Sequence, residues 1–183
     1  MEESGGGVTM CGGEPMMHTD YLCEVLDELG KRGFHRTVDT TLFCSEENVK
    51  RVAERCELFL VDLKLMDSEK HRFYTHVENE QILNNIRMLS EMGKKFWIRI
   101  PLIVGINADD ENLEASAQFL TSLPTKPEMV NLLVYHDVGI GKHARLGTKY
   151  NPESFSMEAP SEEVQQHALN IMQRYGLNTK IGG

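Results

Sequence analysis

The sequence lacks two features that would bring a protein to nucleic acid or to a membrane: clusters of basic residues and long apolar runs. Its 19 Lys and Arg face 28 Asp and Glu, which gives a formal net charge of -9. Phosphate binding depends on clustered Lys and Arg, so we expect no nucleic-acid partner. No run approaches the ~20 apolar residues of a membrane-spanning helix, and the first residues lack the basic and apolar regions of a signal peptide. We therefore expect no membrane contact and a cytoplasmic location.

Cysteine is scarce, and the cysteines that are present stand far apart. Cys11, Cys23, Cys44 and Cys56 are separated by 12, 21 and 12 positions. Metal-binding loops place cysteines within a few residues of one another, so this spacing predicts no metal site. In a reducing compartment, buried cysteines pack as small apolar side chains, which is our interpretation of Cys23 and Cys56.

A chain of 183 residues, 40% of them hydrophobic, fits one globular domain over residues 1–183. Short apolar runs alternate along it with amphipathic stretches, which is the pattern of βα units around a parallel sheet. The expected strands are Gly7–Met10, His35–Asp39, Leu58–Asp62, Phe96–Pro101, Met129–Tyr135 and Thr179–Ile181.

Apolar residues at helical spacing predict helices between these strands. The expected helices cover residues 22–29, 49–56, 82–89, 112–123 and 161–175. Ser45 and Ser161 stand where a serine caps the start of a helix, and Gly30 and Gly93 stand where helices end. Every connection between strands is therefore expected to contain a helix.

Polar residues recur at one place in each unit, directly after the apolar part of a strand. The carboxyl ends of parallel strands meet at one edge of the sheet, where α/β proteins bind ligands. We therefore expect one shared site at that edge. The residues that would form it are Glu14, Asp39, Asp62, Lys64, Arg99 and His136. For Arg99, a salt bridge toward the core is as good an interpretation as a ligand contact.

Two of these strand ends carry residue types that suit a charged ligand. Gly12-Gly13-Glu14-Pro15 follows a strand directly, and paired glycines let a backbone approach a ligand closely. Asp62-Leu63-Lys64 places a carboxylate beside an ammonium, which suits an ionic ligand with separated charges. The same pair also fits a solvated salt bridge at the rim of a barrel. We interpret His18, His71 and His76 as surface residues.

Three segments together resemble the activating enzymes of glycyl-radical enzymes, in the radical S-adenosylmethionine (SAM) class. They are the string from Ser4 to Pro15, Asp62-Leu63-Lys64, and Tyr135-His136. The family usually has Ser or Thr at the position of Cys11 and Pro at that of Val134. The resemblance implies an α/β fold: a partial, TIM-like (β/α) barrel with parallel strands that lacks its first strand.

The resemblance also implies a binding site for SAM. The residues that it assigns to the cofactor are Gly12, Gly13, Glu14, Asp39, Thr40, Asp62, Leu63, Lys64 and His136. It further implies a monovalent cation between Asp39, Thr40 and Asp62. A histidine in the position of His136 can contact an adenine or ribose edge through either ring nitrogen.

In this family, a C-x-x-x-C-x-x-C loop binds a [4Fe-4S] cluster that cleaves SAM reductively and yields a radical. The radical converts a glycine of a partner, such as pyruvate formate-lyase, to a glycyl radical, with an electron donor such as flavodoxin or ferredoxin. That loop precedes the glycine-rich strand in the family and has no counterpart in this sequence. We therefore expect a piece of a longer enzyme, inactive on its own and without catalytic residues, with an open sheet edge at Gly7–Met10.

Two other functions fit the same residues. In one, Lys64 forms a Schiff base with a carbonyl substrate, as in aldolases and lyases, while Glu14, Asp39 or Asp62 moves protons. In the other, the chain is a non-catalytic module that binds a nucleotide or a partner. Trapping of a substrate on Lys64 by borohydride would favour the first.

Overall fold

The computed structural model describes residues 6–136, 147, 151 and 154–182. Ser4 and Gly5 of the glycine-rich string lie outside these ranges. Six parallel strands form one sheet, and their order in the sheet is their order in the chain. The strands are β1 (Gly7–Met10), β2 (His35–Thr40), β3 (Leu58–Asp62), β4 (Phe96–Leu102), β5 (Met129–Val134) and β6 (Thr179–Ile181). All six expected strands are confirmed, with ends within one residue of the prediction.

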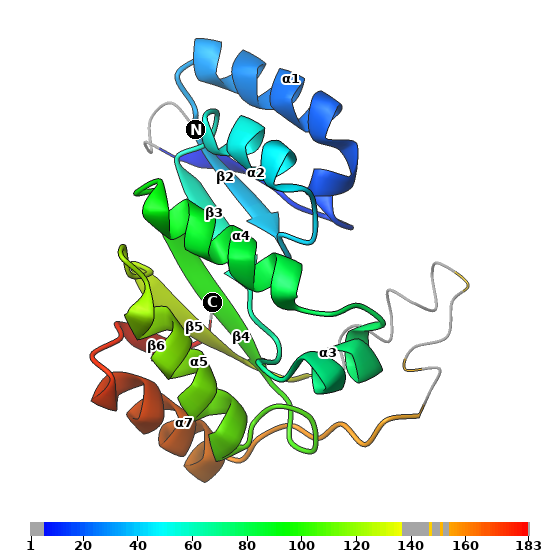
Figure 1. The fold of residues 1–183 in the computed structure, drawn as a ribbon, viewed down its shortest axis with the longest axis vertical. Coiled ribbons are helices and arrows are strands. Elements are labelled where there is room, and N and C mark those ends of the chain that lie inside the picture. The colour runs from blue at the N-terminus through cyan, green and yellow to red at the C-terminus, as the bar shows by residue number, and fades with distance from the viewer. Residues whose placement is uncertain (1–5, 137–146, 148–150, 152–153, 183) are drawn as a thin grey trace.

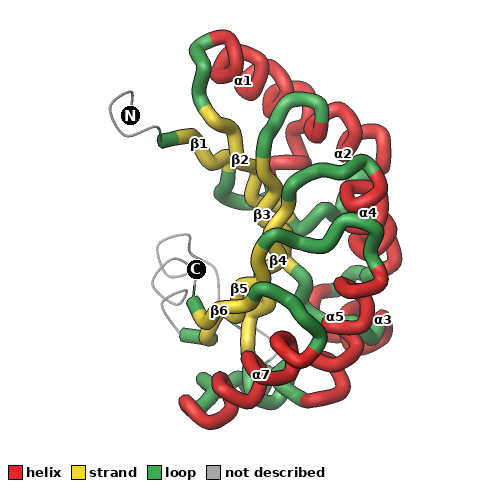
Figure 2. Tube along the Cα trace, turned by 90° about the vertical axis from the view of Figure 1, so that its left-hand side faces the viewer, coloured by secondary structure: helices red, strands yellow, loops and turns green. Residues whose placement is uncertain are grey.

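Helices lie along one side of this sheet (Figure 1). They are the 3-10 helix η1 (Pro15–His18) and the α-helices α1 (Thr19–Lys31), α2 (Glu46–Ala53), α3 (Ser68–Thr75), α4 (Glu80–Glu91), α5 (Asp110–Ser122) and α7 (Glu162–Arg174). Figure 2 shows that the strands follow a curve with the helices on its outer side. The fold is therefore the predicted α/β partial barrel. Its inner face carries no helix among the described residues (Figure 2).

The two faces of the sheet differ because strand residues alternate between them. Along β4, residues alternate strictly between buried and partly exposed. Val61, Ile98 and Ile100 have no solvent exposure and pack in the core beneath the helices. Asp62 and Arg99 occupy the intervening positions and keep some exposure, so the inner face of the curve presents their charges.

Local capping explains where several helices begin. The side chains of Ser45 and Ser161 accept hydrogen bonds from backbone N–H groups of the first turns of α2 and α7, as predicted. Asp67 and Asp109 do the same for α3 and α5. Each cap satisfies one of the backbone donors that a helix start leaves without a partner.

Helix α3 was not predicted, because it has almost no apolar face. His71 is its one buried residue. Phe73 is 62% exposed, and its ring contacts those of Tyr74 and Phe155 rather than the core. Periodicity of apolar residues detects helices that pack on a core, and α3 does not do so along its length.

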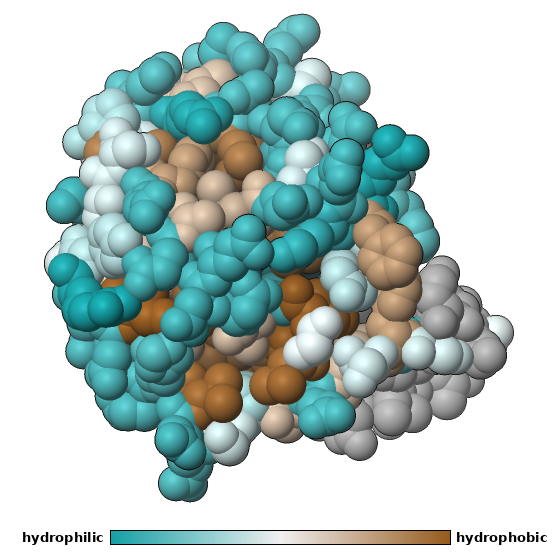
Figure 3. All heavy atoms as spheres, turned by 60° about the horizontal axis from the view of Figure 1, so that its bottom comes forward, coloured by the Kyte–Doolittle hydropathy of each residue, from teal (hydrophilic) through white to brown (hydrophobic). Residues whose placement is uncertain are grey.

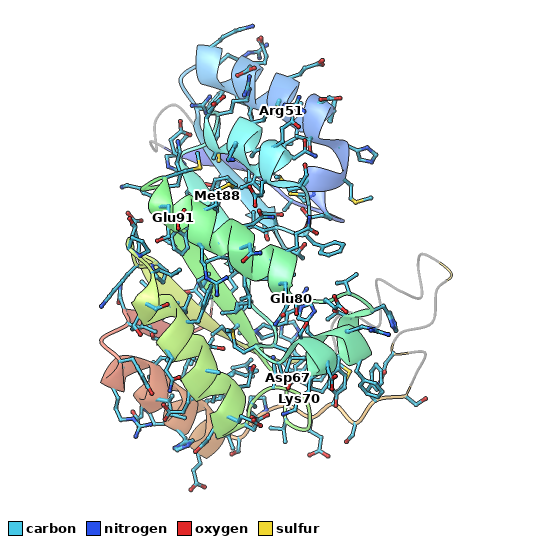
Figure 4. All side chains as sticks on the ribbon, viewed as in Figure 1. Arg51, Asp67, Lys70, Glu80, Met88 and Glu91 are labelled. Atoms are coloured by element: carbon cyan, nitrogen blue, oxygen red, sulfur yellow. The ribbon has the colours of Figure 1, made fainter. Side chains whose placement is uncertain are left out.

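Ion pairs tie the helices together on the outer surface. Arg51 reaches from α2 to Asp20 of α1, and Lys70 reaches from α3 to Glu111 of α5 (Figure 4). Such exposed pairs each contribute less than about 1 kcal/mol. The face shown in Figure 3 is mostly hydrophilic, with separate apolar areas between the polar side chains. No helix in the described ranges is long and apolar enough to span a membrane.

The interpretation of Cys23 and Cys56 as buried side chains is confirmed. All four are free thiols; Cys23 and Cys56 are buried, and Cys11 is exposed at the end of β1. Burial raises the pKa of Cys56 to about 12, and burial followed by the nearby charge of Glu14 raises the pKa of Cys44 to about 11. Thiols with such pKa values are poor nucleophiles at neutral pH.

His76 ends α3 in the left-handed backbone region, with a φ of 66°. This conformation disfavours residues with a Cβ, so His76→Gly should have a free energy of unfolding about 0.5 to 1 kcal/mol higher than His76→Ala, measured by urea titration. Both variants lose the imidazole, so their difference reports the backbone alone. The matched control is Gly93→Ala, because Gly93 has a φ of 65° with no atom within 4 Å of an added Cβ. Gly93→Ala should lower stability by a similar amount, and a His76→Gly variant no more stable than His76→Ala would contradict the explanation.

Candidate functional site

An ionic cluster joins the ends of three neighbouring strands on the inner face. Arg99 of β4 donates from Nε and Nη2 to Oδ1 of Asp62 in β3, at 3.0 and 2.7 Å. Its Nη1 donates to Oδ2 of Asp39 in β2 at 2.8 Å, and its Nη2 also contacts Asp39. Lys64 Nζ lies 3.6 Å from the other oxygen of Asp62. The two carboxylates and two cations therefore form one connected group.

Partial burial gives this cluster its electrostatic character. The side chains of Arg99, Asp39 and Asp62 are 21%, 22% and 23% exposed. Burial raises the pKa of Asp39 above its ordinary value, although the charge of Arg99 opposes the shift. Burial also disfavours the charged form of Arg99, but Asp62 and Asp39 outweigh it and leave the pKa of Arg99 above its ordinary value. The guanidinium therefore stays charged and offsets the cost of burying the carboxylates.

Glu14 ties the glycine-rich turn to the end of β2. Its Oε1 accepts from Met16 N at 3.0 Å and from Thr40 Oγ1 at 2.6 Å. Its Oε2 accepts from the backbone N and the Oγ1 of Thr41, at 2.8 and 2.7 Å. Both carboxylate oxygens thus already accept hydrogen bonds from groups of the protein. Glu14 therefore fixes the turn in place, and its contribution to a ligand would come through the backbone.

Buried asparagines hold the loop that carries Lys64. Asn107 Nδ2 donates to the carbonyl of Lys64 at 2.9 Å, and Asn79 Nδ2 donates to the carbonyls of Leu65 and Met66. Asn112 accepts from Met66 N at 2.9 Å. Our sequence reasoning missed these residues.

For another buried asparagine that holds a loop, the sequence did contain a recognisable pattern. Asn85 lies on the apolar face of α4, between Ile82 and Ile86, and is fully buried. Its Nδ2 donates to the carbonyls of Leu42 and Cys44 in the loop after β2. The amide nitrogen of such a residue must find a partner inside the protein, and here the partner is the loop backbone, whereas Oδ1 of Asn85 has no donor within reach.

A cavity of about 230 Å³ adjoins the cluster, and its lining includes Glu14, Asp62, Lys64 and His71. The interpretation of His71 as a surface residue was wrong, because its exposed fraction is 3%. Its Nδ1 lies 2.7 Å from the carbonyl of Val77, which satisfies the buried ring. Larger hollows on the surface, such as one of about 600 Å³ beside α7, lie away from the strand ends.

The remaining predicted residues do not all point to the inner face. Thr40 is 3% exposed and pairs in register with Val61, so its side chain faces the helices. Leu63 is 2% exposed in the core, and its backbone N donates to the carbonyl of Arg99. His136 is exposed beyond the end of β5. Thr40 and Leu63 are therefore placed to act through their backbone or through packing.

The described residues offer no group of three or more His, Cys, Asp or Glu side chains that would hold a metal ion. Arg99 forms a salt bridge, as one of its two interpretations expected, but on the inner face and not toward the core. Its guanidinium lies between the carboxylates of Asp39 and Asp62, which were predicted to surround a monovalent cation.

Removing the bridge should leave two carboxylates facing each other without their shared cation. We expect Arg99→Met to lower the free energy of unfolding by about 2 kcal/mol, less than for a fully buried pair because the cluster keeps some contact with water. Arg55→Met is the matched control, since Arg55 pairs with the half-exposed Asp27 and its loss should cost less than about 1 kcal/mol.

A second substitution checks that the cost of Arg99→Met comes from uncompensated charge. Asp39→Asn in the Arg99→Met background should recover part of the lost stability in urea unfolding. Equal stabilities of Arg99→Met and Arg55→Met, or a further loss in the double variant, would contradict the role of the bridge.

Comparison with known proteins places this geometry in a family. The family model of the radical SAM superfamily matches residues 2–119. The trans-4-hydroxy-L-proline dehydratase activating enzyme of Clostridioides difficile is 43% identical over 183 residues, which are 100% of this chain and 60% of that protein. The indoleacetate decarboxylase activating enzyme of Tractidigestivibacter scatoligenes is 31% identical and covers 96% of the chain and 55% of its own length. The chain thus spans a little over half of these two relatives.

Two further matches cover most of the matched protein. The pyruvate formate-lyase-activating enzyme of Staphylococcus epidermidis is 35% identical over 93% of this chain and 69% of its own. The crystal structure of a domain of pyruvate-formate lyase-activating enzyme from Bacteroides vulgatus has 48% identity and a TM-score of 0.84, and the match covers 97% of this chain and 99% of that domain. These findings do not favour the Schiff-base or non-catalytic alternatives. The chain belongs to the radical SAM superfamily, in the family of the activating enzymes of glycyl-radical enzymes.

Proposed function

We propose that the inner face at the carboxyl edge of the sheet binds SAM, and that the protein uses it to generate a glycyl radical on a partner enzyme. The observation that carries this proposal is the ionic cluster at the carboxyl ends of β2, β3 and β4, which come after the Gly12-Gly13 turn in the chain. The cluster consists of Asp39, Arg99, Asp62 and Lys64. The partner would be pyruvate formate-lyase or a related glycyl-radical enzyme, because the relatives are named as activating enzymes of such proteins.

The residues present fit SAM by their charges. SAM carries an ammonium, a sulfonium and a carboxylate, so a site for it needs both carboxylates and cations, which the cluster supplies. Gly12 and Gly13 have φ angles of 89° and 56°, and no atom lies within 4 Å of the place where a Cβ would be. The turn backbone is therefore open to close approach by a ligand.

Each predicted residue has a role in this proposal. Gly12 and Gly13 would offer backbone groups to the methionyl end of the cofactor, and Asp62 and Lys64 would pair with its charges. Glu14 and Thr40 would support the site by holding the turn, and His136 would contact the adenosyl part of SAM. The supporting residues are Glu14, Asp39, Thr40, Leu63 and His136. A monovalent cation at Asp39, Thr40 and Asp62 would share the carboxylates with Arg99.

In the activating enzymes, SAM and a [4Fe-4S] cluster would together supply the radical that takes a hydrogen atom from glycine. The sequence contains no closely spaced cysteines, so these residues provide no ligand set for a cluster and we assign them no step through it. The task of the chain is to hold and orient the cofactor and to exclude water around it. A flavodoxin or ferredoxin as electron donor and a cytoplasmic location belong to the same proposal.

Titration calorimetry with SAM tests the site without any cluster. We expect Lys64→Met and Asp62→Asn each to weaken SAM binding about tenfold, the effect of losing one charge-assisted contact. Lys70→Met is the matched control, because Lys70 is a similarly exposed lysine in an ion pair on the outer surface. An equal loss of affinity in Lys70→Met, or none in the site variants, would contradict the assignment.

Alkylation of Cys11 provides an independent readout. Its thiol is exposed directly before Gly12, so bound SAM should slow its reaction with iodoacetamide severalfold, as measured by peptide mass spectrometry. Cys56 should stay unmodified with and without SAM, because its thiol is buried. Unchanged modification of Cys11 at saturating SAM would place the cofactor elsewhere.

A further inference from the structure

A polar row crosses the inner face beyond the ionic cluster. Asp62 pairs in register with Arg99, Arg99 with Asn131, and Asn131 with Lys180. Residues in register on neighbouring parallel strands project from the same face of a sheet. Asn131 on β5 and Lys180 on β6 therefore extend the row from the cluster to the end of the sheet. Neither residue was predicted to belong to the site.

Asn131 is buried without a hydrogen-bond partner for its acceptor. The residue is 3% exposed, and its Oδ1 has no donor within reach. A buried polar atom in this state costs about as much as a lost hydrogen bond and calls for an explanation. Arg99 does not supply one, because each of its three side-chain nitrogens is directed to Asp39 or Asp62.

We propose that the carboxamide of Asn131 recognises a main-chain amide of the polypeptide substrate, as a positioning residue for the segment that carries the target glycine. This inference rests on the proposed function, in which the substrate is a protein. A carboxamide presents an acceptor and a donor side by side, which matches the N–H and C=O of a peptide unit. The charged residues that we assign to the SAM site lie on β2 to β4 and in the loop after β3. On the next strand, β5, Asn131 offers an uncharged polar group, which suits an uncharged ligand such as a peptide backbone.

The position of Asn131 suits a chain-like ligand. It lies on β5, one strand from β6, the last strand of the described sheet. Its register with Arg99 places it on the inner face, which no described helix covers (Figure 2). An extended segment can lie along such a face and present its backbone to side chains that project from it. SAM bound at the ends of β2 and β3 would then lie on one side of Arg99, and the peptide segment at Asn131 would lie on the other.

The test measures binding of fluorescein-labelled, glycine-centred peptides by anisotropy at saturating SAM. We expect Asn131→Leu to weaken peptide binding about fivefold, the net effect of one hydrogen bond, and to leave SAM affinity unchanged. Asn170→Leu, an exposed asparagine on α7, is the matched control and should change neither. Asn131→Asp keeps an acceptor without the donor and guards against failure of the leucine variant to fold.

Two readouts separate recognition from a structural role. Methylation of one backbone N–H of the peptide should weaken its binding to the wild-type chain and have no further effect on binding to Asn131→Leu. The melting temperature of Asn131→Leu should stay unchanged or rise, because the substitution removes an unsatisfied polar group. A fall in melting temperature, with peptide affinity kept, would show that Asn131 is satisfied inside the protein and would overturn the proposal.

The remaining outcomes also decide the question. Weaker SAM binding in Asn131→Leu would assign Asn131 to the cofactor and overturn peptide recognition. A wild-type chain that binds SAM and no peptide would overturn this inference while leaving the proposed cofactor site in place. A wild-type chain that binds no SAM would overturn the proposed function, and the inference would fall with it.

Discussion

Two carboxylates, Asp39 and Asp62, project from neighbouring strands onto the same face of the sheet, and the guanidinium of Arg99 holds them together. The helices cover the other face and bury its apolar residues, so charged groups on the inner face need partners from within that face. Arg99 provides them from the next strand. The inner face can thus carry several charged side chains close together at the strand ends, while the apolar core lies between the sheet and the helices.

The same edge is held rigid by polar side chains from outside the cluster. Glu14 joins the turn after β1 to the end of β2, and Asn85 holds the loop after β2. Asn79 and Asn107 hold the loop after β3. Loops that carry binding groups are otherwise among the mobile parts of a protein. Here buried amides fix the backbone around Lys64, which keeps the charges where a ligand with separated charges can meet them.

Much of this arrangement could be predicted because strands and strand ends follow local rules. The six strands came from short apolar runs, and the cluster came from charges placed directly after them. The partners of those charges could not be predicted, because the choice of Arg99 over Lys64 as the bridge depends on distances between strands. Helix α3 and the burial of His71 were missed for a related reason: a ring paired with the Val77 carbonyl leaves no apolar pattern. Asn131 could not be assigned to the site from the sequence, because its position beside the cluster depends on the register of β5 with Arg99.

The most direct test of the central claim is a crystal structure of this chain grown with SAM. Our account predicts density for the methionyl end of the cofactor within hydrogen-bonding distance of the Gly12-Gly13 backbone and of Asp62 or Lys64, on the inner face. It also predicts that Arg99 remains between Asp39 and Asp62. Density for SAM on the outer, helical surface, or none at the strand ends at saturating cofactor, would contradict the account.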